Sequence, residues 1–462
     1  MQKPLTIVIF GATGDLFQKK LAGALFDLYV KNVLPQKFEL VGFSRKPLSH
    51  EDFRGFIGQA LAGRDTAKLD EFVSHAFYHQ GDLSDAKSYT SLGAFLGERD
   101  TIGGVCSDKL FYLAVPPNLY EVVFNRLSAS GLAIPCAPGL PDEEKAWTRV
   151  LVEKPFGNNQ KEAARLDKLL GKLFEEEQIF RIDHYLAKET MQNIISFRFS
   201  NGLFEPLWSR KHIERVEIKF LENSDVASRG SFYDPVGAFR DVGQNHILQM
   251  LALVAMEDPR QMTADAIRKA RARVLENVAI DFGSMIRGQY GGYRTEKGVQ
   301  PDSKTETYFK LKASIQTLRW RGVPFFLESG KALQKPEVSI SVFFKPTACL
   351  CPDGYQGAYQ NVLTFELAPK EGISVLFWAK KPGFDFELEP KRLSFAFEDE
   401  PVERKIPNAY ERVLLDAIRG DQTLFASTEE VKAEWKVTTP VLEKWEKLPL
   451  HLYDRGSNGP KL

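Results

Sequence analysis

Two short segments hold the residues best suited to phosphate binding and acid–base chemistry. The first, 181–189 (RIDHYLAKE), contains Asp183, His184, Tyr185 and Lys188. If it is helical from Asp183, then His184 and Lys188 lie four residues apart on one face. An imidazole, a tyrosine hydroxyl and a lysine that converge in this way can hold a phosphate through charged hydrogen bonds. The alternative is a capped helix start with a solvated polar face.

The second segment, 241–246 (DVGQNH), directly precedes the apolar stretch 247–256. It places His246 close in sequence to Asp241, and a neutral imidazole next to a carboxylate has the usual composition of a general base. A histidine that leads a buried helix is also often a core or capping residue, and this alternative stays open. The sequence shows no cluster with metal-ligand spacing, so we expect no metal.

A glycine turn at 11–16 (GATGDL) lies between the apolar run 5–10 and a stretch, 16–30, with helical spacing of apolar residues. In this context glycine lets the backbone approach a pyrophosphate, and the N–H groups of the helix start attract it. The pattern is G-x-x-G, and Phe17 stands where a third glycine is common. The turn predicts a dinucleotide site, with an ordinary strand–helix turn as the alternative.

Basic residues lie at the ends of two other predicted strands. Arg45 and Lys46 follow the strand at 38–43, where an NAD site usually carries a carboxylate for the ribose. Two cations suit a 2′-phosphate instead, so we predict NADP over NAD, with a solvated charge pair as the alternative. Lys154 ends a later strand and faces the crevice where open α/β sheets bind ligands, although a lone lysine there is more often a surface residue.

The elements that position these residues divide the chain in two. Buried strands are predicted at 5–10, 38–43, 109–115 and 150–152. Their alternation with helices predicts an α/β domain with a Rossmann-like, doubly wound parallel sheet over 1–182. Polar and apolar residues then alternate at 215–220, 362–367, 373–379 and 393–397. This pattern predicts a larger β+α domain with an antiparallel sheet over 183–462. We also predict helices at 244–256 and 265–278, a mobile loop at 289–307 and a surface insertion at 136–147.

Composition narrows the class of protein. The 462 residues carry 61 Lys and Arg against 61 Asp and Glu, a formal net charge of zero. Neutrality argues against nucleic-acid binding, and no apolar run reaches the roughly 18 residues of a membrane span. The N-terminal apolar run is also too short for a secretory signal.

Four cysteines are too few for a disulfide scaffold, so we expect free thiols and a cytoplasmic protein. They are Cys106, Cys136, Cys349 and Cys351.

Four segments together resemble the glucose-6-phosphate dehydrogenase family. GATGDL, EKPFG, RIDHYLAKE and DVGQNHILQML occur in that family's order, and 320–333, 408–416 and the final GSNGP are similar as well. The resemblance implies oxidation of β-D-glucose 6-phosphate at C1 to 6-phosphoglucono-δ-lactone, the first step of the oxidative pentose phosphate pathway. It implies hydride transfer to NADP, leaves the use of NAD open, and implies a homodimer or homotetramer that associates through the antiparallel sheet.

The resemblance also implies roles for individual residues. His246 is the expected base for the C1 hydroxyl, and Asp183 is the carboxylate that orients its imidazole. Substrate binding is expected of Lys154, His184, Tyr185, Lys188, Glu222, Asp241, Lys331 and Lys20. Cofactor binding is expected of Gly11, Thr13, Gly14, Asp15, Leu16, Arg45 and Lys154.

The chain departs from the family pattern at Phe17, Ala187, Gly243 and Glu328. Glu328 replaces an arginine that helps some relatives hold a second, structural NADP, which argues against that second site here. Two other functions stay open. One is a sugar dehydrogenase of the glucose–fructose oxidoreductase type, which would act equally on unphosphorylated sugar. The other is a non-catalytic NADP-binding protein, which would bind the nucleotide without turnover.

Overall fold

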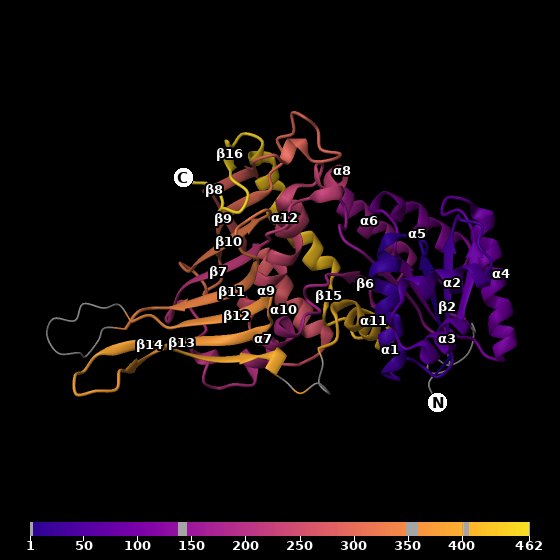
Figure 1. The fold of residues 1–462 in the computed structure, drawn as a ribbon, viewed down its shortest axis with the longest axis horizontal. Helices are drawn as coiled ribbons and strands as arrows, with labels where there is room; N and C mark the ends of the chain where they lie inside the picture. Colours follow the sequence, from indigo (N-terminus) through magenta and orange to yellow (C-terminus); the bar gives the residue numbers. More distant parts are fainter. Residues whose placement is uncertain (1–2, 137–145, 348–358, 400, 402–405, 462) are drawn as a thin grey trace. The chain divides into compact units, whose positions relative to one another are not determined.

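The computed structural model describes residues 3–136, 146–347, 359–399, 401 and 406–461. The chain forms two compact units (Figure 1). Unit 1 comprises Met1–Ala187 and Pro407–Val431, and unit 2 comprises Lys188–Ile406 and Lys432–Leu462. Most of the predicted insertion at 136–147, together with Cys349 and Cys351, lies outside the described residues. The division into domains at 182/183 stays a prediction.

Unit 1 contains a seven-stranded sheet in the order β15-β6-β5-β4-β1-β2-β3. All pairs are parallel except β15 with β6. The other six strands have the doubly wound order, so the predicted Rossmann-like sheet is confirmed. β1 and β4 are buried along their whole length, as their apolar runs predicted. The strands are β1 (Leu5–Phe10), β2 (Phe38–Ser44), β3 (Ala76–Gln80), β4 (Asp108–Leu113), β5 (Thr148–Val152), β6 (Ile179–Ile182) and β15 (Phe425–Ala426).

Several helices of unit 1 begin at residues whose side chains accept backbone N–H groups. Ser49 and Asp85 cap two of them in this way. The helix predicted at 16–30 is confirmed, and part of its first half is π-helical. The helices are η1 (Phe17–Leu21), α1 (Ala22–Val30), α2 (His50–Ala60), α3 (Thr66–Ser74), α4 (Ala86–Gly103), η2 (Pro117–Leu119), α5 (Tyr120–Ala129), α6 (Gln160–Leu173), η3 (Glu176–Gln178) and α11 (Ala409–Arg419), with α12 (Thr428–Trp445) continuing into unit 2.

Unit 2 contains a nine-stranded sheet in the order β14-β13-β12-β11-β7-β10-β9-β8-β16. The predicted antiparallel sheet is confirmed for most pairs, but β7 with β10 and β8 with β16 are parallel. The strands are β7 (Ile213–Leu221), β8 (Val278–Tyr290), β9 (Tyr308–Ile315), β10 (Pro324–Gly330), β11 (Glu337–Phe344), β12 (Val362–Ala368), β13 (Gly372–Lys380), β14 (Leu388–Ala396) and β16 (Leu450–Tyr453).

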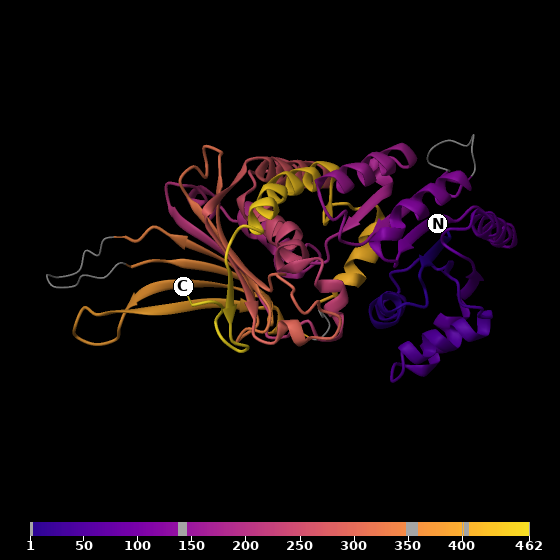
Figure 2. The same ribbon diagram turned by 90° about the horizontal axis from the view of Figure 1, so that it is seen from above.

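Helices pack on one face of this sheet (Figures 1 and 2). η6 contacts β7 and β10, and α7 contacts β12. The predicted inward face of β12, with Leu363, Phe365 and Leu367, is buried. The helices are α7 (Glu189–Phe199), η4 (Glu205–Leu207), η5 (Ala227–Arg229), α8 (Gly230–Tyr233), η6 (Phe239–Ile247), α9 (Leu248–Ala255), α10 (Ala264–Glu276), η7 (Tyr293–Thr295) and η8 (Phe397–Asp399).

Two local predictions differ from the structure. The chain after Asp183 forms a turn rather than a helix, because the Asp183 side chain accepts the Tyr185 N–H at 2.9 Å and competes with helical bonding. β8 takes up the first residues of the predicted loop at 289–307, and three polar residues of that loop, Ser303, Glu306 and Thr307, are buried. Its mobility stays a prediction. Among the described residues, we find no helix with the length and apolarity needed to span a membrane.

Candidate active site

The turn after β1 needs glycine at its first position. Gly11 has φ +83°, and a Cβ there would lie 2.4 Å from the Ala114 carbonyl oxygen. The Gly11 N–H donates to Phe43 O at 2.9 Å, which places this turn beside the end of β2. Phe17 is fully buried against Phe53, so it belongs to the core rather than to the turn. The backbone therefore provides the close approach that a pyrophosphate requires.

The end of β2 is joined to this turn by hydroxyl groups. Thr13 Oγ1 lies 2.9 Å from Ser44 Oγ, and Tyr78 Oη donates to Lys46 O at 2.6 Å. These bonds fix the backbone on both sides of Arg45, whose side chain is exposed. A cation thus lies at the carboxyl end of β2, near the glycine turn, where a 2′-phosphate would bind. The other predicted turn residues, Gly14, Asp15 and Leu16, lie at the helix start, and Lys20 is exposed one turn later.

The carboxyl end of β5 is followed by a half-buried carboxylate that sequence reasoning missed. Tyr112 Oη donates to Glu153 Oε1 at 2.5 Å, and Tyr120 Oη donates to Glu153 O at 2.8 Å. Burial raises the pKa of Glu153, and the neighbouring charge of Lys154 opposes that rise. Glu153 holds the turn that carries the half-buried Lys154. In the sequence, the only indication of this role for Glu153 is its position directly after a buried strand and before Lys154.

Asp183 lies at the carboxyl end of the next strand, β6. It is 5% exposed, and its charge also acts on Glu153, so Asp183 and Lys154 lie on the same edge of the sheet. The His184 ring stacks on Tyr410 with centroids 6.1 Å apart and contacts Tyr185 at 5.0 Å. Within unit 1, the structure thus brings His184 and Tyr185, two of the residues predicted to bind the phosphate, together with Asp183, the carboxylate predicted to orient the base.

Lys188 is the first residue of unit 2, and its ammonium is already engaged there. Nζ donates to Leu367 O at 2.8 Å and to Glu371 Oε1 at 3.2 Å. Glu371 also accepts the Thr190 N–H at the start of α7. Glu371 thus ties the Lys188 side chain to the start of α7.

Glu222 and Lys331 form an ion pair at the ends of β7 and β10, with Nζ and Oε2 2.5 Å apart. Tyr453 Oη donates to Lys331 O at 2.8 Å, and the Lys331 ammonium lies 5.4 Å from the Tyr233 ring centroid. The Tyr233 hydroxyl is buried and has no hydrogen-bond partner among the described residues. Burial and the charge of Asp241 hold its pKa well above the usual value. Tyr233 and Tyr453 were not predicted; the only hint for Tyr453 was its place before GSNGP.

Asp241 and His246 are both carried by the π-helix η6. Hydrogen bonds from i to i+5 stack residues five apart, so the two side chains face the same side. The His246 residue is 1% exposed, and its ring stacks on Phe220, two residues before Glu222, with centroids 6.0 Å apart. Within unit 2 the structure thus gathers Glu222, Lys331, Asp241 and His246 around the ends of β7 and β10. Contact between His246 and Asp183 stays a prediction.

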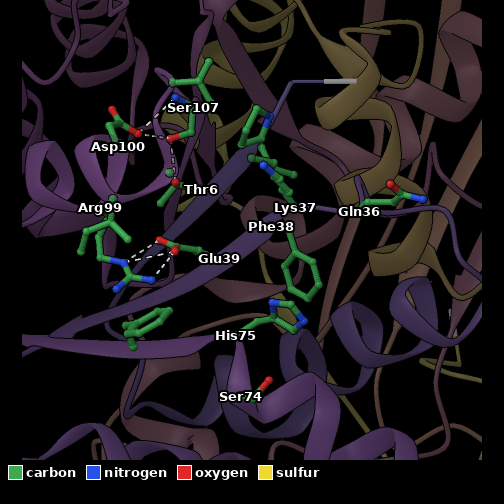
Figure 3. Close-up of a pocket in the computed structure, with 16 residues that line it drawn as sticks. Thr6, Gln36, Lys37, Phe38, Glu39, Ser74, His75, Arg99, Asp100 and Ser107 are labelled. Carbon is green, nitrogen blue, oxygen red and sulfur yellow. Dashed lines mark hydrogen bonds and ion pairs between the residues drawn. The ribbon is translucent and has the colours of Figure 1, made fainter. Parts of the chain in front are cut away.

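A cavity of about 420 Å³ lies at the opposite edge of the unit 1 sheet, near the amino ends of β1 and β2 (Figure 3). Arg99 on its wall makes hydrogen bonds to both carboxylate oxygens of Glu39 and lies 3.9 Å from the Phe77 ring centroid. Asp100 accepts Lys109 Nζ at 2.7 Å. These charged groups already satisfy one another, and the cavity contains none of the predicted site residues.

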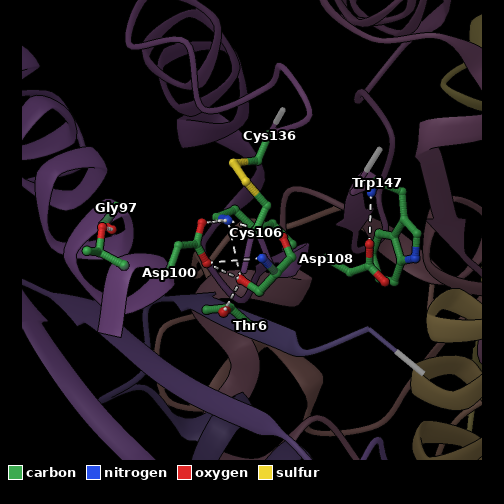
Figure 4. The surroundings of a disulfide bond; sticks show 10 residues. Thr6, Gly97, Asp100, Cys106, Asp108, Cys136 and Trp147 are labelled. Carbon is green, nitrogen blue, oxygen red and sulfur yellow. Dashed lines mark hydrogen bonds and ion pairs between the residues drawn. A yellow bond between two sulfur atoms is a disulfide. The ribbon is translucent and has the colours of Figure 1, made fainter. Parts of the chain in front are cut away.

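A disulfide joins Cys106 and Cys136 near this edge (Figure 4). The prediction of free thiols is wrong for this pair, because residues separated by 30 positions in sequence have Cα atoms 5.8 Å apart. Asp100 lies close enough to form a metal-binding group with the two sulfurs. The disulfide occupies both sulfurs, and Ser107 and Lys109 occupy Asp100, so we assign no metal to this group.

A glycine turn on a doubly wound sheet, followed by a mixed sheet with an acid and a lysine at its strand ends and a histidine on the adjacent helix, is typical of a nucleotide-dependent dehydrogenase. Residues 8–193 match the model of the glucose-6-phosphate dehydrogenase NAD binding domain, and residues 195–462 match that of the C-terminal domain. The chain belongs to the glucose-6-phosphate dehydrogenase family.

Individual relatives match over almost the whole chain. Glucose-6-phosphate 1-dehydrogenase from Aggregatibacter actinomycetemcomitans is 41% identical, over 98% of this chain and 94% of the relative. The enzyme from Chlamydia muridarum is 38% identical, over 96% and 91%. A solved glucose-6-phosphate dehydrogenase in complex with glucose 6-phosphate superposes with a TM-score of 0.92 at 33% identity, covering 100% of this chain and 96% of that one.

Proposed function

We propose that this chain oxidises β-D-glucose 6-phosphate at C1 to 6-phosphoglucono-δ-lactone with transfer of hydride to NADP, as the first step of the oxidative pentose phosphate pathway. The observation that most supports the proposal is the set of groups at the ends of β7 and β10. There, His246 and Asp241 share one face of η6, next to the Glu222–Lys331 ion pair. A base, acids and a lysine at one place match what a phosphorylated sugar requires.

In the proposed mechanism, the His246 imidazole takes the proton of the C1 hydroxyl. Asp183 orients that imidazole and stabilises the imidazolium as charge develops. The nicotinamide of bound NADP would supply the acceptor for the hydride from C1. Glu222, Asp241 and Lys331 are proposed to hold the sugar, and Lys154 is proposed to bind near both the sugar and the nicotinamide. The burial of His246 keeps water away from the base.

The residues at the carboxyl ends of β1 and β2 fit NADP. Gly11 leaves room for the pyrophosphate, and the exposed Arg45 offers a fork-shaped cation to the 2′-phosphate. Lys46 is exposed beside it, and residues 44–46 include no carboxylate that would repel this phosphate. We therefore propose a preference for NADP, with NAD as the weaker acceptor.

The 6-phosphate is proposed to bind His184, Tyr185 and Lys188. Lys188 pairs with Glu371 at 3.2 Å, and this contact holds its ammonium at the start of α7. A phosphate there would accept a charge-assisted hydrogen bond from the ammonium.

One assay tests the proposal directly: reduced-nicotinamide absorbance with glucose 6-phosphate or glucose, each with NADP and with NAD. We expect turnover on the phosphorylated sugar with NADP preferred. His246→Asn should lower kcat by about 10²–10⁴-fold and leave KM for glucose 6-phosphate nearly unchanged. Equal rates on glucose would instead favour an enzyme of the glucose–fructose oxidoreductase type. Binding of NADP without turnover on any hexose phosphate would favour a non-catalytic protein.

We also propose a homodimer or homotetramer that associates through the helix-free face of the unit 2 sheet. That face carries a hollow of about 370 Å³ lined by Arg215, Glu217, Lys219, Lys310, Phe326 and Glu328. Mixed charges around an apolar residue suit a self-complementary contact between two copies. Light scattering should give a dimer or tetramer mass, and Lys219→Glu combined with Lys310→Glu should lower it. A monomer mass for the unmodified chain would refute this proposal.

We also propose that the protein is located in the cytoplasm, which cell fractionation would test.

A further inference from the structure

The helix that carries His246 is anchored on its other side by one buried carboxylate. Gln244 Nε2 donates to Glu434 Oε2 at 3.3 Å, and Gln249 Nε2 donates to Glu434 Oε1 at 2.7 Å. Glu434 belongs to the part of α12 within unit 2 and is 3% exposed. Gln244 lies in η6 and Gln249 is the second residue of α9, which follows η6 without a break, and both amides reach the same carboxylate.

The spacing of residues in η6 also determines the side of the helix on which His246 lies. Residues 244 and 246 are two positions apart, which is about half of a π-helical turn. Glu434 therefore holds the side of the helix roughly opposite to the one on which His246 stacks against Phe220. A helix fixed on both sides cannot rotate about its axis without breaking one set of contacts.

The other end of η6 is also fixed by a buried acid. Glu306 Oε1 accepts the Phe239 N–H at 3.0 Å, and a Cβ at Gly237 would lie 2.5 Å from the same oxygen. Glu306 thus sets where the helix begins. The rotation of the helix then depends on the contacts along its sides, and Glu434 supplies a charged contact on the side of the two glutamines.

We propose that Glu434 is a positioning residue, which fixes the rotation of η6 and with it the alignment of the His246 imidazole with the reacting C1 hydroxyl. The inference rests on the proposed role of His246 as the base. A displacement of about 1 Å at a reacting group can cost about 10²-fold in rate, so a small rotation is enough to matter. Glu434 touches neither sugar nor nucleotide in this role and acts through the two glutamines.

The test compares three variants by kcat, KM and thermal unfolding. Glu434→Met removes both acceptors and should lower kcat by about 10–100-fold, with KM for NADP changed by less than about twofold. Glu434→Gln should stay within about threefold of the wild-type kcat. Its amide can accept from Gln244 and donate to Gln249 Oε1, which has no partner among the described residues.

Glu430→Met is the matched control. Glu430 is buried on the same helix, four residues earlier, and its carboxylate accepts the Ser427 N–H at 2.8 Å at the start of α12. We expect it to lower the melting temperature while kcat stays within about twofold. An unchanged kcat in folded Glu434→Met overturns the proposal, as does a Glu434→Gln variant that is as damaged as Glu434→Met.

Two further measurements separate this inference from the proposed function. If Glu434→Met does not fold, the variant Gln249→Met tests the positioning role instead. It removes one of the two hydrogen bonds to Glu434 and should lower kcat by about threefold or more, and an unchanged kcat overturns the proposal.

If His246→Asn loses turnover while the Glu434 variants do not, His246 remains the base and only the positioning role is wrong. If His246→Asn keeps its turnover, the proposed base itself is wrong.

Discussion

Replacement of Gly11 by alanine tests whether the turn after β1 binds the nucleotide. Gly11 has φ +83°, a conformation that costs an L-residue about 1–2 kcal/mol. The new Cβ would also lie 2.4 Å from Ala114 O, about 1 Å short of the 3.4 Å at which ordinary contact begins. The Ala114 N–H donates to Phe10 O, so β4 cannot withdraw without breaking the sheet. We therefore expect the turn itself to move by about 1 Å.

A displacement of this size should raise KM for NADP by about 10–100-fold, because the pyrophosphate depends on N–H groups held in place by the turn. KM for glucose 6-phosphate should change by less than about threefold. Initial rates at varied NADP, with titration calorimetry of NADP alone, measure the effect.

The control for Gly11→Ala is Gly63→Ala. Gly63 has φ +88°, but a Cβ there meets nothing within 4 Å. It should therefore lose about 1–2 kcal/mol of stability without any change in KM. A KM for NADP in Gly11→Ala within twofold of the wild-type value, in a folded protein, would refute the assignment of this turn to the cofactor.

Two further predictions concern a phosphate contact and a buried acid. Lys188→Ala should raise KM for glucose 6-phosphate by about tenfold or more with little change in kcat, since it removes a charge from the proposed phosphate site; lower kcat at an unchanged KM would contradict that role. Burial raises the pKa of Asp416 from 3.8 to about 6 despite its bond with Arg412. The folded state therefore binds this proton more tightly, and its contribution to stability, about 3 kcal/mol, is fully present only below the unfolded pKa of 3.8 and is lost as the pH rises through the folded pKa of about 6. Urea unfolding of wild type and Asp416→Asn should show that difference, and parallel pH curves would contradict it.

Much of the fold followed from local patterns. Apolar runs that end at turn residues predicted β1, β2, β4 and β5, and period-two alternation predicted β12 and its buried face. These patterns work because burial on one or two faces dictates residue type directly. The disulfide and the parallel pair β7–β10 depend on contacts between distant segments, for which the sequence carries no local signal.

In the candidate site, too, some residues could be predicted from local sequence patterns and others could not. Motif residues such as Gly11, Lys154 and His246 lie at strand ends or on a buried helix, where their spacing predicted them. Their supporting groups were missed, because Glu153, Tyr453 and Glu434 act through hydrogen bonds to partners remote in sequence. The spacing of His184 and Lys188 by four residues fits a helix as well as a turn, and the hydrogen bond from the Tyr185 N–H to the Asp183 carboxylate favours the turn.

The strongest remaining prediction is that Asp183 and His246 act as one catalytic unit. Asp183→Asn should lower kcat by about 10²-fold or more with a nearly unchanged KM, because an amide cannot stabilise the imidazolium that forms when the base takes its proton. If the carboxylate works only through that imidazole, it has nothing to act on once His246 is replaced. The double variant with His246→Asn should then be no slower than the slower single variant, within about threefold. If the two residues acted independently, the fold-losses in kcat of the single variants would multiply in the double variant. A kcat on glucose 6-phosphate that is lower by that product would therefore refute the coupling of Asp183 and His246.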